Sequence, residues 1–271
     1  MHFGGIFMNG SSFGTYFKIT TFGESHGAAL GVIVDGCPAG VPLSAEYIQS
    51  YLNRRKPGQN LYSTPRKEND AVEILSGVFE EKTTGTPIAL LIRNESQRSG
   101  DYSEIASYYR PGHADFTFDA KYGFRDYRGG GRSSGRETAA RVAAGAVACA
   151  MLDELGIKVC AYAKSINKYI CFDTKEYLAE RFSPEELASL RDKSPLNMPD
   201  ETASAKAEAF LTKLREEHNS AGGTIECVLT GLPAGLGDPV FEKFDARLAH
   251  AMLSIGAVKG FELGYGFDAA L

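Results

Sequence analysis

The stretch RGGGRSSGRETAARVAAGAVACAMLDEL, residues 128–155, decides how this chain folds. From Thr138 onward it is so rich in Ala and Val that a helix there would have apolar side chains around most of its circumference. Such a helix is stable only when most of its surface is buried. Ser134, followed three residues later by Glu137, predicts a capping box at its start. The stretch therefore predicts a helix inside the fold.

The residues just before this helix predict an anion site. A buried helix presents a fixed N-terminus, whose backbone N–H groups and dipole attract negative charge. Arg132, Arg136 and three consecutive glycines lie immediately before the helix. A Walker A loop is excluded, because G-x-x-x-x-G-K-[ST] requires a Lys that is absent here. In the alternative interpretation, Ser134 and Glu137 only cap a core helix. That explains the capping box but not the arginines and glycines.

Shorter elements flank the buried helix on both sides. Alternating or continuous apolar runs predict four strands, and capping residues with amphipathic spacing predict three helices. The strands are expected at 15–22, 28–36, 72–79 and 87–93, and the helices at 44–55, from Ser183 onward and at 200–219. The polar stretch 94–104 is interpreted as a surface loop.

Composition limits the class of protein. The chain has 271 residues, of which 43% are hydrophobic, and a formal net charge of −5. These values are typical of a soluble globular protein and argue against a general nucleic-acid binder. No apolar run approaches the roughly 20 residues that cross a bilayer. The 5 cysteines are scattered without C-x-x-C spacing, which favours a reducing cytoplasm and predicts neither disulfides nor a metal site.

The chain is expected to form one domain, because no long low-complexity linker divides it. Residues 1–12 are interpreted as an N-terminal extension that is non-native or disordered, with Met8 as a candidate start. Residues 13–271 are expected to be a single domain, truncated at its C-terminus. One internal similarity suggests two related halves: VIVDGCPAGVPL at 32–43 and CVLTGLPAGLGD at 227–238 both give a strand, then G-x-P-A-G, then a helix.

The sequence GESHG, residues 23–27, also reads as G-x-S-x-G, the nucleophile elbow of serine hydrolases. That motif requires a strand before it and a helix directly after it. Here a Val-rich strand follows, so the motif is expected on a loop between two strands and Ser25 is not expected to be a nucleophile. A simple glycine-closed turn is the alternative, yet such a turn does not need Glu, Ser and His together.

Two further clusters carry charge. In YRPGHAD, residues 109–115, Pro111 and Gly112 predict an irregular turn that could direct Arg110 and His113 into one pocket. The second cluster consists of Arg54, Arg55, Lys56, Arg66 and Lys67. Taken separately, each cluster is compatible with solvated surface charge. Together they suggest a basic pocket in an acidic protein, which predicts an anionic small-molecule ligand.

The motifs GESHG, DGxPAG, RPGHAD and RGGGRSSxRET, in this order, resemble the chorismate synthase family from about Phe13 to the last residue. The resemblance implies an α+β fold, a β-α-β sandwich with buried helices between two antiparallel sheets. It also implies a cytoplasmic homotetrameric lyase of the shikimate pathway, which makes aromatic amino acid precursors. The implied reaction is the 1,4-anti elimination of phosphate from 5-enolpyruvylshikimate 3-phosphate to give chorismate. The implied cofactor is reduced FMN, with NADPH as an external reductant.

The resemblance also implies roles for individual residues. His26 is the acid that protonates the departing phosphate, with Ser25 as a hydrogen-bonding relay beside it, and His113 keeps a proton near the flavin. Both roles suit an imidazolium, because a neighbouring phosphate raises the pKa of a histidine. Contacts to substrate carboxylates and phosphate are implied for Arg55, Arg66, Arg110 and Arg136, and contacts to flavin for Arg132, Ser133, Ser134, Gly256 and Ala257.

The sequence departs from the family pattern in three places. Leu61 occupies a position where many members have Arg, and Gly256 replaces the usual Asn. The chain also ends before an Arg- and Asp-containing family motif that is credited with deprotonating C6. The alternative hypothesis is therefore a truncated, catalytically impaired binder of phosphorylated anions or flavin. A flavin reductase is a weaker alternative, since no G-x-G-x-x-G follows a strand.

Overall fold

The computed structural model describes residues 10–58, 60–62, 68–95, 105–174, 176–177 and 183–270. The described chain divides into two compact units, 1–231 and 232–271, and each is treated by itself. The prediction of one domain over 13–271 stays a prediction. The 1–12 extension and the 94–104 loop lie mostly outside the described residues.

The first unit contains a five-stranded antiparallel sheet with strand order β1-β2-β3-β7-β4. Its strands are β1 (Ser12–Phe13), β2 (Lys18–Gly23), β3 (Ala29–Asp35), β4 (Val72–Ser76) and β7 (Ile88–Arg93). Alternate residues of the two central strands are fully buried: Leu30, Val32, Val34, Ile88, Leu90 and Ile92. Because side chains alternate across a strand, these six make one apolar face.

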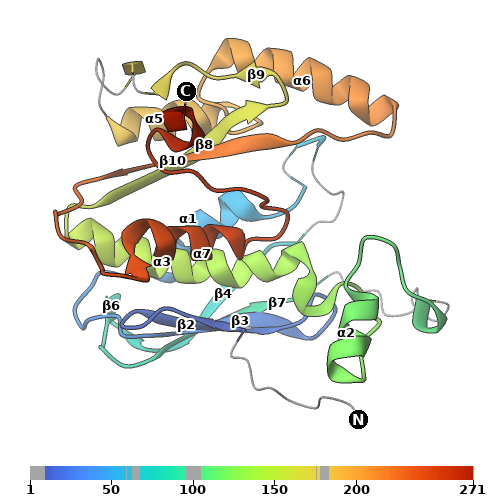
Figure 1. The fold of residues 1–271 in the computed structure, drawn as a ribbon. Helices are drawn as coiled ribbons and strands as arrows, with labels where there is room; N and C mark the ends of the chain where they lie inside the picture. Colours follow the sequence, from blue (N-terminus) through green and yellow to red (C-terminus); the bar gives the residue numbers. More distant parts are fainter. Residues whose placement is uncertain are drawn as a thin grey trace. The chain divides into compact units, whose positions relative to one another are not determined.

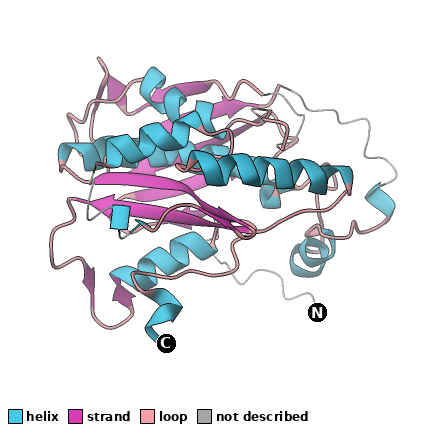
Figure 2. Ribbon diagram, turned by 90° about the horizontal axis from the view of Figure 1, so that it is seen from above, coloured by secondary structure: helices cyan, strands magenta, loops and turns pink. Residues whose placement is uncertain are grey.

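A second antiparallel sheet, with strand order β10-β8-β9, lies on the other side of the first unit. Its strands are β8 (Lys158–Ile166), β9 (Tyr169–Ile170) and β10 (Gly223–Thr230). The helices α5 (Pro184–Lys193) and α6 (Glu201–Glu216) pack on β8 and β9. Seen from above, helices lie in front of the strands and run in roughly the same direction (Figure 2).

The helices α3 (Thr138–Glu154) and α1 (Ala45–Arg55) lie between the two sheets (Figure 1). Seven side chains of α3 are buried, and six of them are alanines. Their small size lets the helix approach both neighbouring layers, and the apolar face of the five-stranded sheet joins them in one core. The predicted α+β sandwich with buried helices between two antiparallel sheets is confirmed.

The predicted capping box is wrong. Ser134 Oγ accepts from the backbone N of Arg136 and caps only a short 3₁₀ turn, η4 (Gly135–Glu137). The α-helix begins at Thr138, and the Glu137 carboxylate does not return to Ser134. It accepts from Thr21 Oγ1 at 3.1 Å and Arg141 Nε at 2.9 Å instead. The Glu137 carboxylate therefore accepts from Thr21 on a distant strand and from Arg141 one helical turn later, and not from the backbone of Ser134.

Most other elements agree with their sequence signals. Ser44 and Ser183 accept at the N-termini of α1 and α5, as predicted, and Asp200 does the same at the start of α6. The expected strand at 72–79 is broken, because Gly77 has φ +81° and separates β4 from β5 (Val78–Phe79). The remaining short elements of the first unit are β6 (Lys82–Thr83), η2 (Ile105–Ser107), α2 (Asp115–Tyr122) and η3 (Gly131–Ser133). All five cysteines are free.

The second unit contains β11 (Gly237–Asp238), β12 (Glu242–Lys243), α7 (Phe244–Leu253) and η5 (Gly266–Ala270). The repeated G-x-P-A-G turn has a matching backbone in its two copies. Gly36 and Gly40 have φ +83° and +89°, and their counterparts Gly231 and Gly235 have φ +74° and +95°. Glycine adopts this left-handed region without the strain of a Cβ. The local likeness supports the prediction of two related halves.

Candidate functional site

The GESHG loop joins the antiparallel strands β2 and β3. No helix follows it, so the hydrolase elbow is excluded by its context, as expected. Ser25 is 1% exposed, and its Oγ lies 3.1 Å from Nδ1 of the half-buried His26. The loop is closed by a bond from the Gly27 N–H to the Glu24 carbonyl. The hydroxyl of Ser25 thus supports one side of the imidazole.

The glycine-rich stretch after residue 128 lies directly against this histidine. Gly129 has φ +71°, and a Cβ added there would fall 2.0 Å from His26 Nδ1. The Gly129 carbonyl accepts from Arg110 NH2 at 2.6 Å. Two motifs that are about 100 residues apart, and the RPGHAD turn, therefore meet around His26.

The RPGHAD turn is held by an internal ion pair. Arg110 Nε and NH2 lie 2.9 and 2.8 Å from the two carboxylate oxygens of Asp115. These hydrogen bonds, strengthened by the charge of Arg125, hold the pKa of Asp115 well below its usual range. His113 is exposed, with Nδ1 3.2 Å from the Pro111 carbonyl. The turn therefore presents His113 on its surface while Arg110 faces inward.

Arg132 is anchored to the strand that leads into the GESHG loop. Its guanidinium donates to the Gly23 carbonyl at 3.0 Å and to Thr21 Oγ1 at 2.6 Å. Ser133 is exposed and Ser134 is half-buried. A Cβ added to Gly131 or Gly135 meets no atom within 4 Å, so open space borders this loop.

Arg136 does not lie where the sequence predicted. Its side chain is 4% exposed and donates from Nε to Asn94 Oδ1 at 2.8 Å and from NH1 to Asp70 Oδ1 at 2.5 Å. NH2 lies 3.7 Å from Glu68 Oε2. The guanidinium is thus already surrounded by protein acceptors, because a buried charge needs partners that replace water. This surrounding corrects the expectation that Arg136 faces an anionic ligand at the helix N-terminus.

Arg55 shares a carboxylate with Arg136. Arg55 NH1 lies 2.6 Å from Asp70 Oδ2, and Arg55 Nε donates to Thr138 Oγ1 at 3.2 Å. Its side chain keeps 17% exposure, whereas the Asp70 side chain has none. Burial lowers the pKa of Arg55, and the Asp70 carboxylate opposes that effect. NH2 of Arg55 also donates to the Gly135 carbonyl at 3.4 Å, so the guanidinium is held by three protein acceptors while part of the side chain stays exposed.

The structure does not place every expected site residue. Arg66 lies outside the described residues. Gly256 and Ala257 belong to the second unit, where both are exposed and Ala257 has φ +70°. Leu61, the departure from the family pattern, is 72% exposed.

Several site residues were missed by sequence reasoning. Asp70, Asn94 and Asp115 each hold an expected site residue or its loop through side-chain hydrogen bonds. Asp115 was detectable, because it ends the RPGHAD motif. Asp70 and Asn94 had no local signal, since their partners are distant in sequence.

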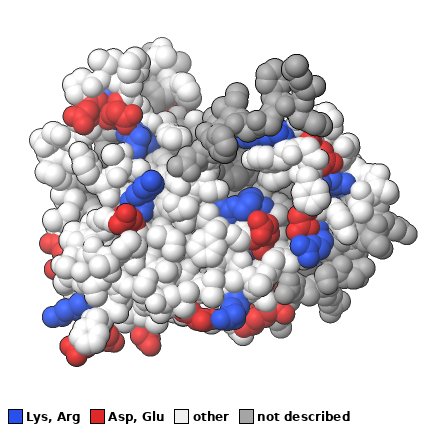
Figure 3. Space-filling view, turned by 90° about the horizontal axis from the view of Figure 1, so that it is seen from below, with Lys and Arg blue, Asp and Glu red and all other residues white. Residues whose placement is uncertain are grey.

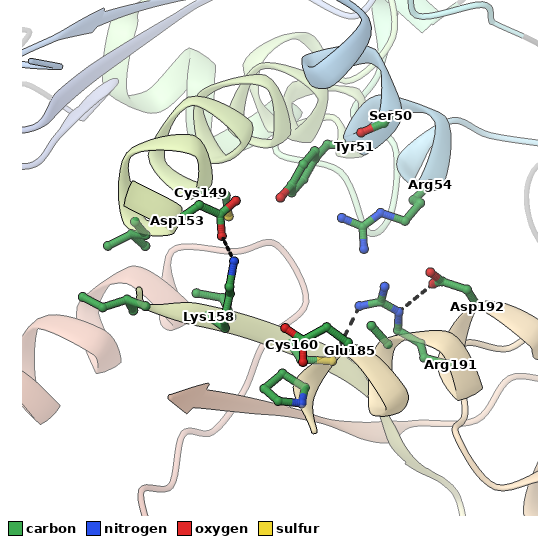
Figure 4. Close-up of a pocket in the computed structure, with 15 residues that line it drawn as sticks. Ser50, Tyr51, Arg54, Cys149, Asp153, Lys158, Cys160, Glu185, Arg191 and Asp192 are labelled. Atoms are coloured by element: carbon green, nitrogen blue, oxygen red, sulfur yellow. Dashed lines mark hydrogen bonds and ion pairs between the residues drawn. The ribbon is translucent and has the colours of Figure 1, made fainter. Parts of the chain in front are cut away.

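Another cavity lies in the described part of the first unit, away from these residues. It has a volume of about 410 Å³ and is lined by α1, α3, β8 and α5 (Figure 4). Lys158 pairs with Asp153 at 2.7 Å and Arg191 with Asp192 at 2.8 Å. Arg54 lies over the ring of Tyr51. Because its acidic and basic groups are largely paired with each other, we assign this cavity no part in the site.

The described surface gives little sign of other ligands. On the face drawn in Figure 3, Lys and Arg side chains alternate with Asp and Glu rather than forming one basic patch. None of the described helices has both the length and the apolar character that a bilayer crossing requires. Among the described residues, no group of three His, Cys, Asp or Glu side chains could hold a metal ion.

Comparison with known proteins gives a consistent result. Residues 17–271 match the family model described as chorismate synthase. The chain is 63% identical over 263 residues to the chorismate synthase of Lachnoclostridium phytofermentans, covering 97% of this chain and 69% of that protein. It is 61% identical to the chorismate synthase of Agathobacter rectalis, with the same coverage. A crystal structure of chorismate synthase superposes with a TM-score of 0.78 at 37% identity, covering 94% of this chain and 71% of that one.

Proposed function

This chain belongs to the chorismate synthase family, and from that premise we propose that it eliminates phosphate from 5-enolpyruvylshikimate 3-phosphate to give chorismate. The reaction breaks the bond between C3 and the phosphate oxygen, removes a proton from C6 and forms the second ring double bond. The observation that carries the proposal is the convergence of Ser25, His26, Gly129 and Arg110 in one unit.

We assign the proton donation to His26. A departing phosphate is a better leaving group when an acid protonates it, and general acids of this kind contribute about 10²- to 10⁴-fold. Ser25 Oγ, at 3.1 Å from Nδ1, orients the imidazole. Bound phosphate would favour the imidazolium, since an adjacent negative charge raises the pKa of a histidine. His113, which is exposed on the RPGHAD turn, is proposed to keep a proton near the reduced flavin.

We assign the contacts with the carboxylates and phosphate of the substrate to Arg55, Arg66 and Arg110. A planar guanidinium binds a carboxylate or phosphate through two parallel hydrogen bonds. The Arg55 contact is the best supported of these, because its guanidinium is held in place by Asp70, Thr138 and the Gly135 carbonyl yet its side chain keeps 17% exposure. Arg110 would have to exchange part of its Asp115 pair for substrate. Arg136 is left out, because it is buried among protein acceptors.

The residues around the glycine-rich loop fit a flavin phosphate or ring edge. Ser133 is exposed, and its neighbours Gly131 and Gly135 border open space, since a Cβ added to either would meet no atom within 4 Å. Arg132, Ser133 and Ser134 would hold the cofactor there. For Gly256 and Ala257, which belong to the second unit, a flavin contact is proposed from the family resemblance alone. Reduced FMN, when bound, lends electron density to the breaking C–O bond and recovers it, so no net oxidation occurs. NADPH is proposed as the external reductant of the cofactor.

The assembly and location are proposed from the family resemblance alone. We propose a homotetramer that acts in the cytoplasm on a small-molecule substrate, without nucleic acid or membrane. Analytical ultracentrifugation at micromolar concentration would test the assembly, and a monomer under all conditions would contradict it.

The proposed reaction can be tested directly. The chain is incubated anaerobically with chemically reduced FMN and the substrate, and chorismate and released phosphate are measured together. We expect equal amounts of both products from the unmodified chain and little of either from His26→Ala. Substrate binding without product from the unmodified chain would instead support the alternative, a binder of phosphorylated anions. The 63% identity to a chorismate synthase does not favour that alternative.

A further inference from the structure

We infer that Asn94, Arg136 and Asp70 form a buried positioning network. This network holds the His26 loop and the Arg55 guanidinium at fixed positions relative to each other. The inference rests on the roles proposed above for His26 and Arg55. The network is continuous: each of its three members is hydrogen-bonded through its side chain to the next. Its two ends contact the two parts of the site.

At one end, Asn94 holds the GESHG loop. Asn94 Nδ2 donates to the Glu24 carbonyl at 3.0 Å and to the Gly27 carbonyl at 2.8 Å, and its backbone N–H donates to Ala28 at 3.1 Å. Ser25 and His26 lie between the two carbonyls that the side chain holds. The amide therefore restrains the backbone on both sides of the proposed acid, which makes Asn94 a positioning residue.

At the other end, Asp70 holds Arg55. The two oxygens of the Asp70 carboxylate are divided between Arg136 NH1 and Arg55 NH1. Asp70 itself has φ +50°, an unusual backbone conformation for a residue other than glycine. Its carbonyl accepts from Gln49 Nε2 at 3.2 Å, so α1 also holds the backbone in this position.

Burial makes this network rigid. The side chains of Asp70 and Arg136 are 0% and 4% exposed. A buried ion pair that loses one partner leaves an uncompensated charge, which disfavours alternative arrangements. Arg136 has few options, because Asn94, Asp70 and the Glu68 carboxylate surround it. A substitution at either end should therefore affect mainly the part of the site that this end holds.

The two ends can be tested separately. Asn94→Asp keeps an acceptor for Arg136 but replaces the donor that faces two carbonyls with an oxygen that repels them. We expect kcat to fall by about 10-fold or more, with a nearly unchanged substrate Kd, since small misplacements of catalytic groups are costly. Asp70→Asn keeps the shape but removes the charge that holds Arg55. We expect the substrate Kd to rise by about 10-fold, with a smaller effect on kcat at saturating substrate.

Substrate Kd is measured by calorimetry, kcat by anaerobic turnover and folding by thermal melting. Glu226→Gln is the matched control. It makes the same kind of carboxylate-to-amide change where Tyr162 and Thr174 contact the carboxylate, outside the network, and should leave kcat and Kd unchanged. If Asp70→Asn does not fold, Thr138→Val removes the other side-chain contact to Arg55 and should raise the substrate Kd.

The outcomes separate the inference from the proposed function. Equal changes in kcat and Kd in both network variants, in step with melting temperature, would mean a merely structural role and overturn the inference. Unchanged parameters in both would overturn it as well. If His26→Ala keeps normal turnover and Arg55→Ala keeps normal binding, the proposed function itself fails.

Discussion

The α-carbon of Gly129 lies against the imidazole of His26, so that a Cβ at this position would fall 2.0 Å from Nδ1 and 2.4 Å from Cε1. No real Cβ contact is this short, so any larger residue must displace the ring or the loop. The glycine is therefore required by a close approach as well as by its φ of +71°. This contact joins the GESHG and RGGGRSSxRET motifs in space.

Gly129→Ala should lower kcat by about 10²-fold, because displacing the ring of His26 by about 1 Å misaligns the proposed acid. Substrate Kd should change little. Gly156→Ala is the matched control: its φ is also positive, at +72°, but its added Cβ meets no atom within 4 Å and it lies outside the proposed site. Anaerobic turnover and calorimetry of both variants make the comparison. Equal losses would mean that backbone strain, not the contact with His26, determines the effect.

His26→Ala and His113→Ala should each lower turnover by about 10²-fold or more while substrate still binds, as the loss of proton donation requires. Ser25→Ala should be milder, because water can replace a hydrogen-bonding relay. The measurement is single-turnover chorismate formation with substrate in excess of its Kd. Near-normal turnover of either histidine variant would remove the role assigned to it, and a covalent ester on Ser25 would revive the hydrolase hypothesis.

Substrate binding should weaken as salt is added, because ions screen the attraction between the arginines and the anionic substrate. The Kd is measured by calorimetry between about 50 mM and 500 mM NaCl. Over this range the Debye length falls from about 14 Å to about 4 Å. Arg55→Ala should show a smaller salt dependence than the unmodified chain. A Kd that does not respond to salt would contradict a charge-based site.

Asp115→Asn should destabilise the fold by about 2–3 kcal/mol at neutral pH, because Arg110 loses its charged acceptor. The pKa of Asp115 is depressed in the folded chain, so its contribution is present above the unfolded pKa of about 3.9 and is lost as pH falls toward the folded value. The difference between the variant and the unmodified chain should therefore narrow below about pH 4.

Urea unfolding at a series of pH values checks this expectation. Asp35→Asn is the control, because Asp35 is exposed and Asn keeps an acceptor for the Gly36 N–H. The assigned ion pair would be contradicted if the difference in unfolding free energy between Asp115→Asn and the unmodified chain stayed constant down to about pH 2.

Gly145→Ala should raise the free energy of unfolding by up to about 1 kcal/mol, since Ala has the higher helix propensity and Gly145 lies inside α3. An added Cβ there meets no atom within 4 Å. Ala146→Leu, at the next position, should instead destabilise by about 1–3 kcal/mol, because Ala146 is fully buried between the layers. Thermal melting of both variants tests the packing of this helix, and a stabilising Ala146→Leu would contradict it.

Local elements could be predicted because their signals are local. Ser44 and Ser183 were identified as caps from their own neighbourhoods, the helix from Asp200 from its amphipathic spacing, and the alanines of α3 indicated its burial. The strand at 72–79 failed because the turn at Gly77 interrupts an otherwise regular apolar pattern. The capping box failed because Thr21 and Arg141 compete for the Glu137 carboxylate.

By itself, the sequence determined the buried helix, the caps and the presence of Ser25, His26 and His113 on loops. Only the tertiary structure decided which carboxylate meets which guanidinium, and so moved Arg136 from the expected anion site into the interior with Asp70 and Asn94. The physical reason is the separation in sequence between the groups that interact. Helix and strand periodicity depends on neighbours within a few residues, whereas a buried charge is stabilised only by partners that packing brings together from distant parts of the chain.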